Sequence, residues 1–543
     1  MQKKLIKLDL ENFLNLFLFP FFSALLLALS FPKFDYPIFL FVSFIPLFWV
    51  LSKKEKNTFE IFIISIIFGV SSYIFLLYWI VYTLVKYGNL NFILASFLLL
   101  VLSAYLSLYY FIFFYISSKI QAFSLPSFLK GLVLSCFFIG TEFLRSFLLT
   151  GFPWALLGYP LSNFHYLLQI ADLLGIWGLS FIAIFVNYFF YFLLRKASLY
   201  NLYSKEFILN ILFFGLILFL ILLYCVYTKF KWEQFLKEHK HEISMSLLQG
   251  NIPQELKEAK EIEISLSTYK DLSLKALQEQ PHIIAFPETA LPFYFPHERE
   301  PTLKFLGFLE YLKELAEAKG LTPPVIIFGA FRVSSSASTL IVHNSLFAWD
   351  GENIGDFYDK EKLVPFGEYV PLAKFFPFLK KISVVSDILR PGISKNLMVK
   401  SKGLNLVITP LICFESAFPQ ISIKRVRAGG EVIFIATNDA WFGKTSAPYQ
   451  HFQMAIVRAV EARRYVAQAA NTGITGFIDP LGKTTLKSTL EKEEVITKNI
   501  KPIRSQTLFV KWGYLFPYFC LFFLLFFVLF SFTQSKIRRQ FGN

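Results

Sequence analysis

Three residues in the C-terminal half of the chain have the types needed for acyl transfer through a covalent intermediate: Glu288, Lys360 and Cys413. A cysteine attacks as its thiolate, and a carboxylate can take the thiol proton and return it as a general acid. A lysine ammonium can stabilise the oxyanion of a tetrahedral intermediate. This chemistry needs no histidine, and the seven histidines show no metal-ligand spacing. We therefore expect neither a metal nor a cofactor.

Each of these residues also has an ordinary structural explanation. A cysteine in a strand is usually a core residue, a glutamate after a proline can cap a helix, and a lysine in a charged turn is usually solvated. Cys413 is, however, the only one of four cysteines outside the long apolar segments. An intradomain disulfide is therefore excluded in the soluble part, and a lone thiol there is a candidate nucleophile.

The elements that must position this set are short strands alternating with helices. Such alternation predicts an α/β fold with a mostly buried sheet, and sites in such sheets form at the carboxyl ends of strands. A helix expected at 416–427 would place its positive dipole end near Cys413. The expected strands are 243–248, 282–286, 325–331, 345–349, 404–412, 432–437 and 466–471, and the expected helices before Cys413 are 255–278 and 302–319.

The rest of the chain has the composition of a membrane protein. Hydrophobic residues make up 55% of the 543 residues and charged residues 17%, against about 25% charged in soluble domains. Segments of about 20 apolar residues predict membrane spans. The first is read as an uncleaved anchor, because further spans follow it at once. We expect about eight spans, at 13–29, 36–51, 61–84, 92–116, 132–149, 173–194, 207–227 and 514–532.

Basic residues collect on alternate loops between these segments, which predicts that those loops are cytoplasmic. The soluble part, between the last two spans, would then lie outside the cytoplasm. The net charge of +15 is explained by this anchoring, or by attraction to anionic phospholipid. It is too scattered to favour nucleic-acid binding. The residues concerned are Lys3, Lys4, Lys7, Lys53, Lys54, Lys56, Lys119, Lys130, Arg195, Lys196, Lys205, Lys536, Arg538 and Arg539.

Two ionisable residues, Glu142 and Arg145, fall inside the fifth predicted span, on one helix face. Ionisable residues in a membrane are costly and often functional. The alternative is a structural ion pair near the end of the span.

The catalytic set and its surroundings resemble the nitrilase superfamily of carbon–nitrogen hydrolases, and within it the apolipoprotein N-acyltransferases. One departure is Lys362, where many relatives have His or Arg. The resemblance covers nearly the whole chain, and its motifs are at 142–145, 150–154, 248–254, 286–290, 363–369, 413–415, 438–443 and 471–473. It implies three parts: an N-terminal transmembrane domain at 1–230, an extracytoplasmic nitrilase-like αββα sandwich at 240–505, and a C-terminal transmembrane helix at 513–533.

The resemblance also implies a reaction. Cys413 would take an acyl chain from a phospholipid as a thioester and pass it to the α-amino group of the diacylglyceryl-cysteine of an apolipoprotein. Glu288 would move protons, while Lys360 and the backbone N–H of Phe414 would hold the oxyanion. Glu368 would orient Lys360 or aid proton transfer. Glu415, Tyr369 and Trp441 are supporting or substrate-binding residues by motif position alone, and the location implied is the bacterial cytoplasmic (inner) membrane.

Two aromatic segments beside the catalytic motifs favour a lipid substrate. Phe293 and Tyr294 follow Glu288, and Phe375 and Phe376 follow Glu368. We expect them to form loops that enter the membrane or a lid that admits acyl chains; the alternative is that they pack on their own domain.

Two other functions compete with the acyltransferase. A membrane-tethered amidase of the same superfamily would share the catalytic set but would not need aromatic loops. A transporter or scaffold with a degenerate domain is disfavoured because the set is intact, and because corresponding halves show no pair of broken helices.

Overall fold

The computed structural model describes residues 10–53, 56–199, 204–336, 339–371, 389–401 and 403–541. Their contacts divide the chain into two units. We call the first the helical unit, which takes in residues up to 81, 91–228 and those from 514 onward. The second, the sandwich unit, takes in 82–90 and 229–513. The short segment 82–90 thus belongs with residues far from it in sequence.

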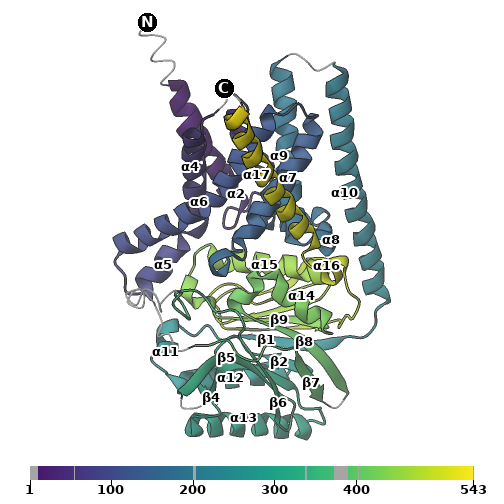
Figure 1. The fold of residues 1–543 in the computed structure, drawn as a ribbon. Helices are drawn as coiled ribbons and strands as arrows, with labels where there is room; N and C mark the ends of the chain where they lie inside the picture. The colour runs from purple at the N-terminus through teal and green to yellow at the C-terminus, as the bar shows by residue number, and fades with distance from the viewer. Residues whose placement is uncertain are drawn as a thin grey trace. The chain divides into compact units, whose positions relative to one another are not determined.

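The helical unit consists of apolar helices (Figure 1). Its longer helices are α2 (Phe19–Ser30), α3 (Ile45–Ser52), α4 (Thr58–Leu77), α6 (Phe92–Ala122), α7 (Ser127–Arg145), α9 (Ile176–Ser198), α10 (Lys205–Glu238) and α17 (Leu515–Phe541). Helix α4 contacts α2 and α6, and α7 contacts α6, α9 and α17. The short elements are η1 (Leu14–Leu18), η2 (Pro37–Phe41), η3 (Leu148–Thr150), η4 (Tyr159–Asn163), η5 (Leu167–Ile170) and α8 (Ala171–Leu174).

Within the described residues, six helices are long and apolar enough to cross a membrane, and two shorter apolar helices lie at Pro37–Ser52 and Leu515–Leu529. The chain is therefore a membrane protein with six to eight apolar helices, in agreement with the predicted spans. The third prediction, 61–84, was too long. Helix α4 ends at Leu77, and a separate helix, α5 (Trp79–Lys86), follows. Hydropathy alone does not reveal this break, because both helices are apolar.

The buried pair in α7 satisfies the backbone of an irregular loop. Arg145 Nη2 lies 3.8 Å from Glu142 Oε1. Arg145 also donates to the carbonyl oxygens of Trp154 and Ala155, at 3.2 and 3.4 Å. Glu142 Oε1 accepts the N–H of Leu157 at 2.6 Å. Non-helical backbone among membrane helices needs such partners, so these contacts favour the structural explanation of the pair.

The sandwich unit is built on two sheets, which confirms the predicted α/β class. The first sheet runs β13-β1-β2-β4-β5-β6, with β3 paired to β4, and the second runs β12-β11-β10-β9-β8-β7. Strands β1, β2 and β4 are parallel, as are β8, β9 and β10. The strands are β1 (Ile243–Gln249), β2 (Ile283–Ala285), β3 (Leu291–Phe295), β4 (Val325–Ser336), β5 (Thr339–Trp349), β6 (Ile354–Asp359), β7 (Leu397–Ser401), β8 (Leu404–Ile412), β9 (Val432–Thr437), β10 (Val466–Ala470), β11 (Gly476–Ile478), β12 (Thr484–Lys487) and β13 (Glu494–Ile500).

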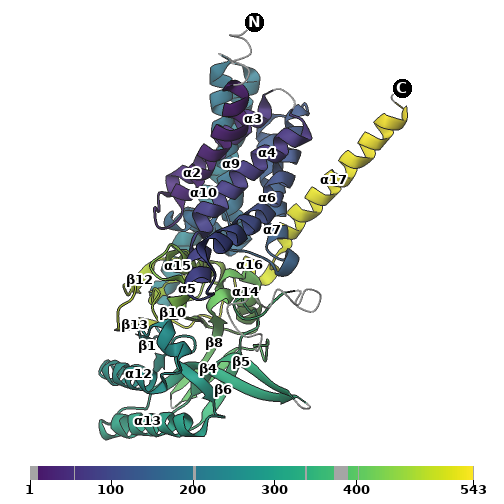
Figure 2. The same cartoon turned by 90° about the vertical axis from the view of Figure 1, so that its left-hand side faces the viewer.

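Helices cover the outer face of each sheet, which gives the layer order of an αββα sandwich (Figures 1 and 2). Helices α12 and α13 lie against the first sheet, and α14 and α15 against the second. Apolar residues of both sheets, such as Leu247 and Ile408, form the core between them. The helical elements are α11 (Gln254–Glu258), α12 (Ile262–Leu277), α13 (Arg299–Ala318), η7 (Cys413–Ala417), α14 (Pro419–Arg427), η8 (Asp439–Phe442), α15 (Ala447–Ala462) and α16 (Leu508–Trp512).

Two predicted helices need correction. The helix expected at 255–278 is interrupted, because Lys260 has a positive φ of 54° that ends α11. The helix expected at 416–427 begins only at Pro419 in α14, and the turn that starts at Cys413 is the 3₁₀ helix η7. Any dipole effect on Cys413 therefore comes from a short turn rather than from a long helix.

Candidate active site

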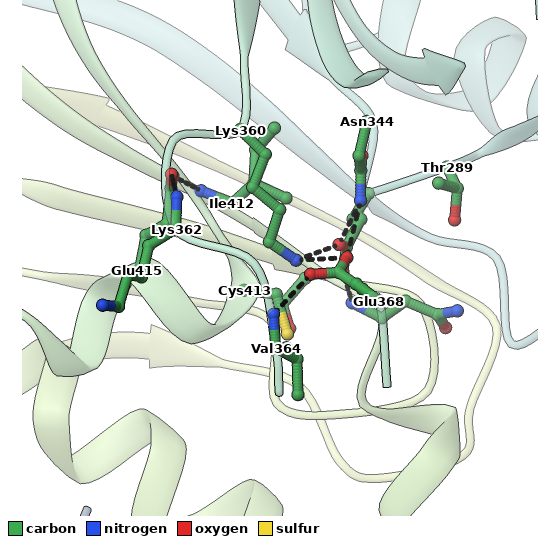
Figure 3. Close-up of polar contacts among 12 residues, drawn as sticks. Thr289, Asn344, Lys360, Lys362, Val364, Glu368, Ile412, Cys413 and Glu415 are labelled. Carbon is green, nitrogen blue, oxygen red and sulfur yellow. Dashed lines mark hydrogen bonds and ion pairs between the residues drawn. The ribbon is translucent and has the colours of Figure 1, made fainter. Parts of the chain in front are cut away.

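Two of the three predicted residues meet directly in the sandwich unit. Lys360 Nζ lies 3.1 Å from Glu288 Oε1 and 2.8 Å from Glu368 Oε1 (Figure 3). Glu288 follows β2 and Lys360 follows β6, so both lie at strand ends, as expected. The side chain of Lys360 is 1% exposed. The arrangement is a buried ammonium shared by two carboxylates.

The carboxylate of Glu288 is held from three directions. Asn344 donates to Oε1 at 2.7 Å, and the backbone N–H of Asn438 donates to Oε2 at 2.9 Å. The third partner is Lys360, whose own backbone N–H donates to the carbonyl of Asn344. Asn438 follows β9 in the second sheet, so Glu288 joins the two sheets at the site.

Glu368 is fixed in a similar way. Its Oε2 accepts the backbone N–H of Val364 at 2.8 Å, while Oε1 faces Lys360. The four-residue turn between Val364 and Glu368 therefore aims this carboxylate at the ammonium. Burial acts to lower the pKa of Lys360, but the charges of Glu288 and Glu368 outweigh it, and the pKa is raised. Lys360 is therefore a permanent cation at this site.

Cys413 completes the set at the end of β8, beside the Lys360 ammonium (Figure 3). Burial raises the pKa of its thiol well above the usual value; Glu288 raises it further, and Lys360 opposes both. The backbone of Cys413 has φ +51°. This left-handed conformation is uncommon for a residue with a side chain and is typical of functional sites.

Glu415 links the loop after Lys360 to the turn that holds Cys413. It accepts the backbone N–H groups of Glu361 and Ile412 at 2.6 and 2.7 Å, and the hydroxyl of Tyr358 at 2.7 Å. Burial raises the pKa of its carboxyl group, while these donors oppose the shift. Its contacts therefore hold this loop and this turn together.

Other predicted residues lie around this centre. The ring of Phe414 packs on Phe418, and Tyr369 packs on the apolar cluster that contains Leu363. The ring of Trp441 contacts that of Tyr87 at 5.1 Å, and the carbonyl of Trp441 accepts the hydroxyl of Thr83.

The predicted aromatic loop after Glu288 was wrong. Its residues form strand β3, and Phe293 is 1% exposed in the core of the first sheet. Tyr294 is half-buried on the ring of Phe331. The alternative, that this segment packs on its own domain, holds here because β3 pairs with β4. Phe375 and Phe376 lie outside the described residues.

Sequence reasoning missed four polar residues around the site. Asn344 and Asn438 contact Glu288. Lys257 donates to the Glu288 carbonyl at 3.3 Å, and burial lowers the pKa of this lysine to about 7 against the attraction of Glu288. His451 contacts the carbonyl of Cys413. Only Asn438 lay in a motif already noted, and the others carry no local signal. Among the described residues, no three His, Cys, Asp or Glu side chains cluster in a way that could hold a metal ion.

The fold and this site define the class: a carbon–nitrogen hydrolase domain carried by membrane helices. The carbon–nitrogen hydrolase family model matches residues 245–507, and the model of the apolipoprotein N-acyltransferase N-terminal domain matches 23–189. Apolipoprotein N-acyltransferase of Geobacter metallireducens is 32% identical over 95% of both chains, and that of Pasteurella multocida is 30% identical over 91% of both. The chain belongs to the apolipoprotein N-acyltransferase family.

A solved structure, Nit3 of Saccharomyces cerevisiae from branch 10 of the nitrilase superfamily, is 19% identical, with a TM-score of 0.35. It covers 49% of this chain, which spans 92% of that structure.

Proposed function

We propose that this enzyme moves an acyl chain from a phospholipid to the free α-amino group of an apolipoprotein's N-terminal diacylglyceryl-cysteine. The observation that carries the proposal is the buried Glu288–Lys360–Glu368 group beside Cys413. It occurs in a chain that matches named apolipoprotein N-acyltransferases along nearly its whole length. An acyl donor held in the bilayer and an acceptor anchored in it suit an enzyme with six to eight apolar helices.

In the first half-reaction, Cys413 attacks the ester carbonyl while its proton passes to Glu288. Because the thiol pKa is raised, attack and proton transfer occur together rather than from a standing thiolate. The carbon–sulfur bond forms, and the carbonyl oxygen becomes an oxyanion. Its collapse breaks the ester bond; the leaving alkoxide of the lysophospholipid takes the proton back from Glu288, and a thioester remains.

Lys360 is suited to hold that oxyanion. An ammonium has three N–H donors, and among the described residues two of them bind Glu288 and Glu368. The third is left for a developing negative charge. A fixed donor in a water-poor site stabilises such charge strongly. The backbone N–H of Phe414 is proposed as a second donor.

In the second half-reaction, the amine of the acceptor attacks the thioester. Its proton goes to Glu288, the carbon–nitrogen bond forms, and the carbon–sulfur bond breaks. The thiolate of Cys413 then recovers the proton, which returns the enzyme to its starting state. The sequence is ping-pong, because the first product leaves before the second substrate reacts.

We propose that the sandwich unit lies on the extracytoplasmic face of the bacterial cytoplasmic membrane. The support is the placement of basic residues on the alternate loops that would face the cytoplasm. We propose three parts, with boundaries near 1–230, 240–505 and 513–533.

The test is direct detection of the acyl-enzyme. The purified full chain is incubated with phospholipid labelled in its acyl chains, quenched in acid and digested, and Cys413 is examined by mass spectrometry. We expect an acyl mass on Cys413 that disappears when a diacylglyceryl peptide is added. Cys413→Ala should lose the adduct, whereas Cys136→Ala, a matched loss of a cysteine in α7, should keep it. A native chain that forms no thioester but hydrolyses amides would overturn the proposal in favour of an amidase.

A further inference from the structure

A second charged pair contacts the backbone of the proposed nucleophile. His451, in α15, lies with Nδ1 3.0 Å from Asp439 Oδ1 and with Nε2 3.1 Å from the carbonyl oxygen of Cys413. Both side chains are completely buried. The proposed proton transfers use neither residue. Their burial beside Cys413 therefore calls for a separate explanation.

The partners of His451 fix its protonation. The carbonyl of Cys413 only accepts hydrogen bonds, so Nε2 must donate. Asp439 Oδ1 also accepts the hydroxyl of Thr437 at 2.8 Å, so it acts as an acceptor toward Nδ1 as well. Burial acts to lower the pKa of His451, but Asp439 and the Cys413 carbonyl outweigh it and the pKa is raised. With both ring nitrogens facing acceptors, these contacts favour the imidazolium form.

The same contacts hold Cys413 in a conformation that it would not adopt alone. Its φ of +51° is costly for a residue with a Cβ. Ser416 donates to the Cys413 carbonyl at 3.0 Å, and its oxygen lies 2.7 Å from His451 Nε2. Because the hydroxyl hydrogen of Ser416 is donated to the carbonyl, the hydroxyl oxygen accepts the N–H of His451 Nε2. The imidazolium thus holds the carbonyl both directly and through Ser416.

This arrangement also explains two sequence motifs that the catalytic set leaves unused. Asp439 lies in the 438–443 motif, and Gly473 ends the 471–473 motif. A Cβ added to Gly473 would lie 2.3 Å from Asp439 Oδ2. The missing side chain at 473 therefore makes the room in which Asp439 faces His451.

We propose that His451, held and kept charged by Asp439, is a positioning residue that fixes the strained backbone of Cys413 and sets a positive charge next to the nucleophile. The inference rests on the proposed role of Cys413. The charged groups that act on the thiol are Glu288, Lys360 and Asp439, and His451 offsets the negative charge of Asp439, with which it pairs.

The test uses the full chain in detergent and two measurements. The first is the single-turnover rate of thioester formation from labelled phospholipid. The second is the pH profile of Cys413 alkylation by iodoacetamide, followed by mass spectrometry, which reports the thiolate without any lipid. His451→Gln keeps an N–H donor but loses the charge, and His451→Phe loses both. His343→Gln is the matched control, because His343 is also buried between two polar partners.

We expect His451→Phe to slow thioester formation by about 10- to 100-fold, the loss that follows from one charged hydrogen bond. His451→Gln should recover part of that rate. Both variants should move the alkylation midpoint to higher pH, because a neighbouring cation is lost, while His343→Gln should behave as native. A folded His451→Phe chain with the native rate and midpoint overturns the inference.

If the His451 variants do not give a folded chain, the rate of thioester formation in Asp439→Asn tests the inference instead. It keeps the shape of the side chain and removes the charge that holds the ring. We expect thioester formation about tenfold slower, and a native rate in that folded variant overturns the inference. Failure of the proposed function is distinct from this outcome, because it would appear as a native chain without any acyl adduct.

Discussion

The carboxylate of Glu415 lies 2.7 Å from the hydroxyl of Tyr358, and this contact joins the two sheets next to the proposed catalytic residues. Tyr358 is on β6, just before Lys360, and Glu415 is in the turn that begins at Cys413. The proposed nucleophile and the proposed oxyanion-binding lysine come from different sheets. Their separation is thus set by groups that cross between the sheets, and Glu415 is one of these.

Glu415→Gln should weaken both the fold and the site. The amide keeps one oxygen and replaces the other by an NH₂ group, which would face the backbone N–H of either Glu361 or Ile412, so that donor loses its acceptor. We expect a loss of about 2–3 kcal/mol in the free energy of unfolding, with slower thioester formation. Tyr358→Phe removes only one donor and should cost about 1 kcal/mol. Chemical denaturation in detergent measures both, and equal losses would contradict this account.

Glu288→Gln should separate thiol acidity from catalysis. In the native chain burial and Glu288 both raise the pKa of Cys413, so the thiolate becomes abundant only above the ordinary thiol range. Removing the Glu288 charge removes one of these causes and leaves Lys360 to favour the thiolate. The alkylation profile of Cys413 should therefore move to lower pH, while acyl transfer falls by about 100-fold or more. A shift to higher pH would show that Glu288 does not act on the thiol through its charge.

The sequence was informative where one local pattern decides the structure. The strand at 404–412 coincides with β8, because a short, mostly apolar segment rich in β-branched residues before Cys413 suits a strand with a buried end. The ends of such runs predicted Glu288, Lys360 and Cys413 as neighbours, and long apolar segments predicted the membrane helices. These features depend on periodicity and composition, which a single chain displays.

The rest depends on contacts between distant segments. Asn344 contacts Glu288 across 56 positions, and His451 reaches the carbonyl of Cys413 across 38. The residues that flank Asn344 and His451 in the sequence do not indicate which residue each of them contacts. The prediction for Phe293 failed for a related reason. An aromatic segment is compatible with a lipid-facing loop and with a buried strand, and here the segment is a strand because β3 pairs with β4.

Glu368→Gln should impair Lys360 without removing it. The amide still reaches the ammonium, but the charged contact at 2.8 Å is lost. We expect thioester formation to slow by about tenfold, the value of one charge-assisted hydrogen bond. Glu361→Gln is the matched control from the same loop, since Glu361 pairs with Arg425 rather than with Lys360. Its partly exposed pair should change the rate by less than about threefold. Similar losses in both variants would point to general damage to the loop.

Gly473→Ala should act on the site through Asp439. The new Cβ would meet Asp439 Oδ2 at 2.3 Å, so the carboxylate or the loop must move. We expect a loss of about 1–3 kcal/mol in stability, as for other overpacked positions, together with slower thioester formation. Gly307→Ala is the control, because nothing lies within 4 Å of its added Cβ in α13. That change should stabilise the chain by about 0.5–1 kcal/mol. A Gly473→Ala chain that forms the thioester at the native rate would show that the position of Asp439 does not affect the reaction.

Arg145→Leu should be more damaging than the loss of both members of its pair. The single change leaves the buried carboxylate of Glu142 without its cation, and removes the hydrogen bonds that Arg145 donates to the carbonyls of Trp154 and Ala155. We expect a loss of about 3–5 kcal/mol in the free energy of unfolding, as for other broken buried pairs.

In Glu142→Leu/Arg145→Leu no unpaired charge remains, so the double variant should be more stable than Arg145→Leu alone. A double-mutant cycle built from unfolding in detergent measures the coupling. Strictly additive losses would mean that the two residues support the 150–158 loop separately, and that their ion pair contributes nothing beyond the backbone contacts that each residue makes.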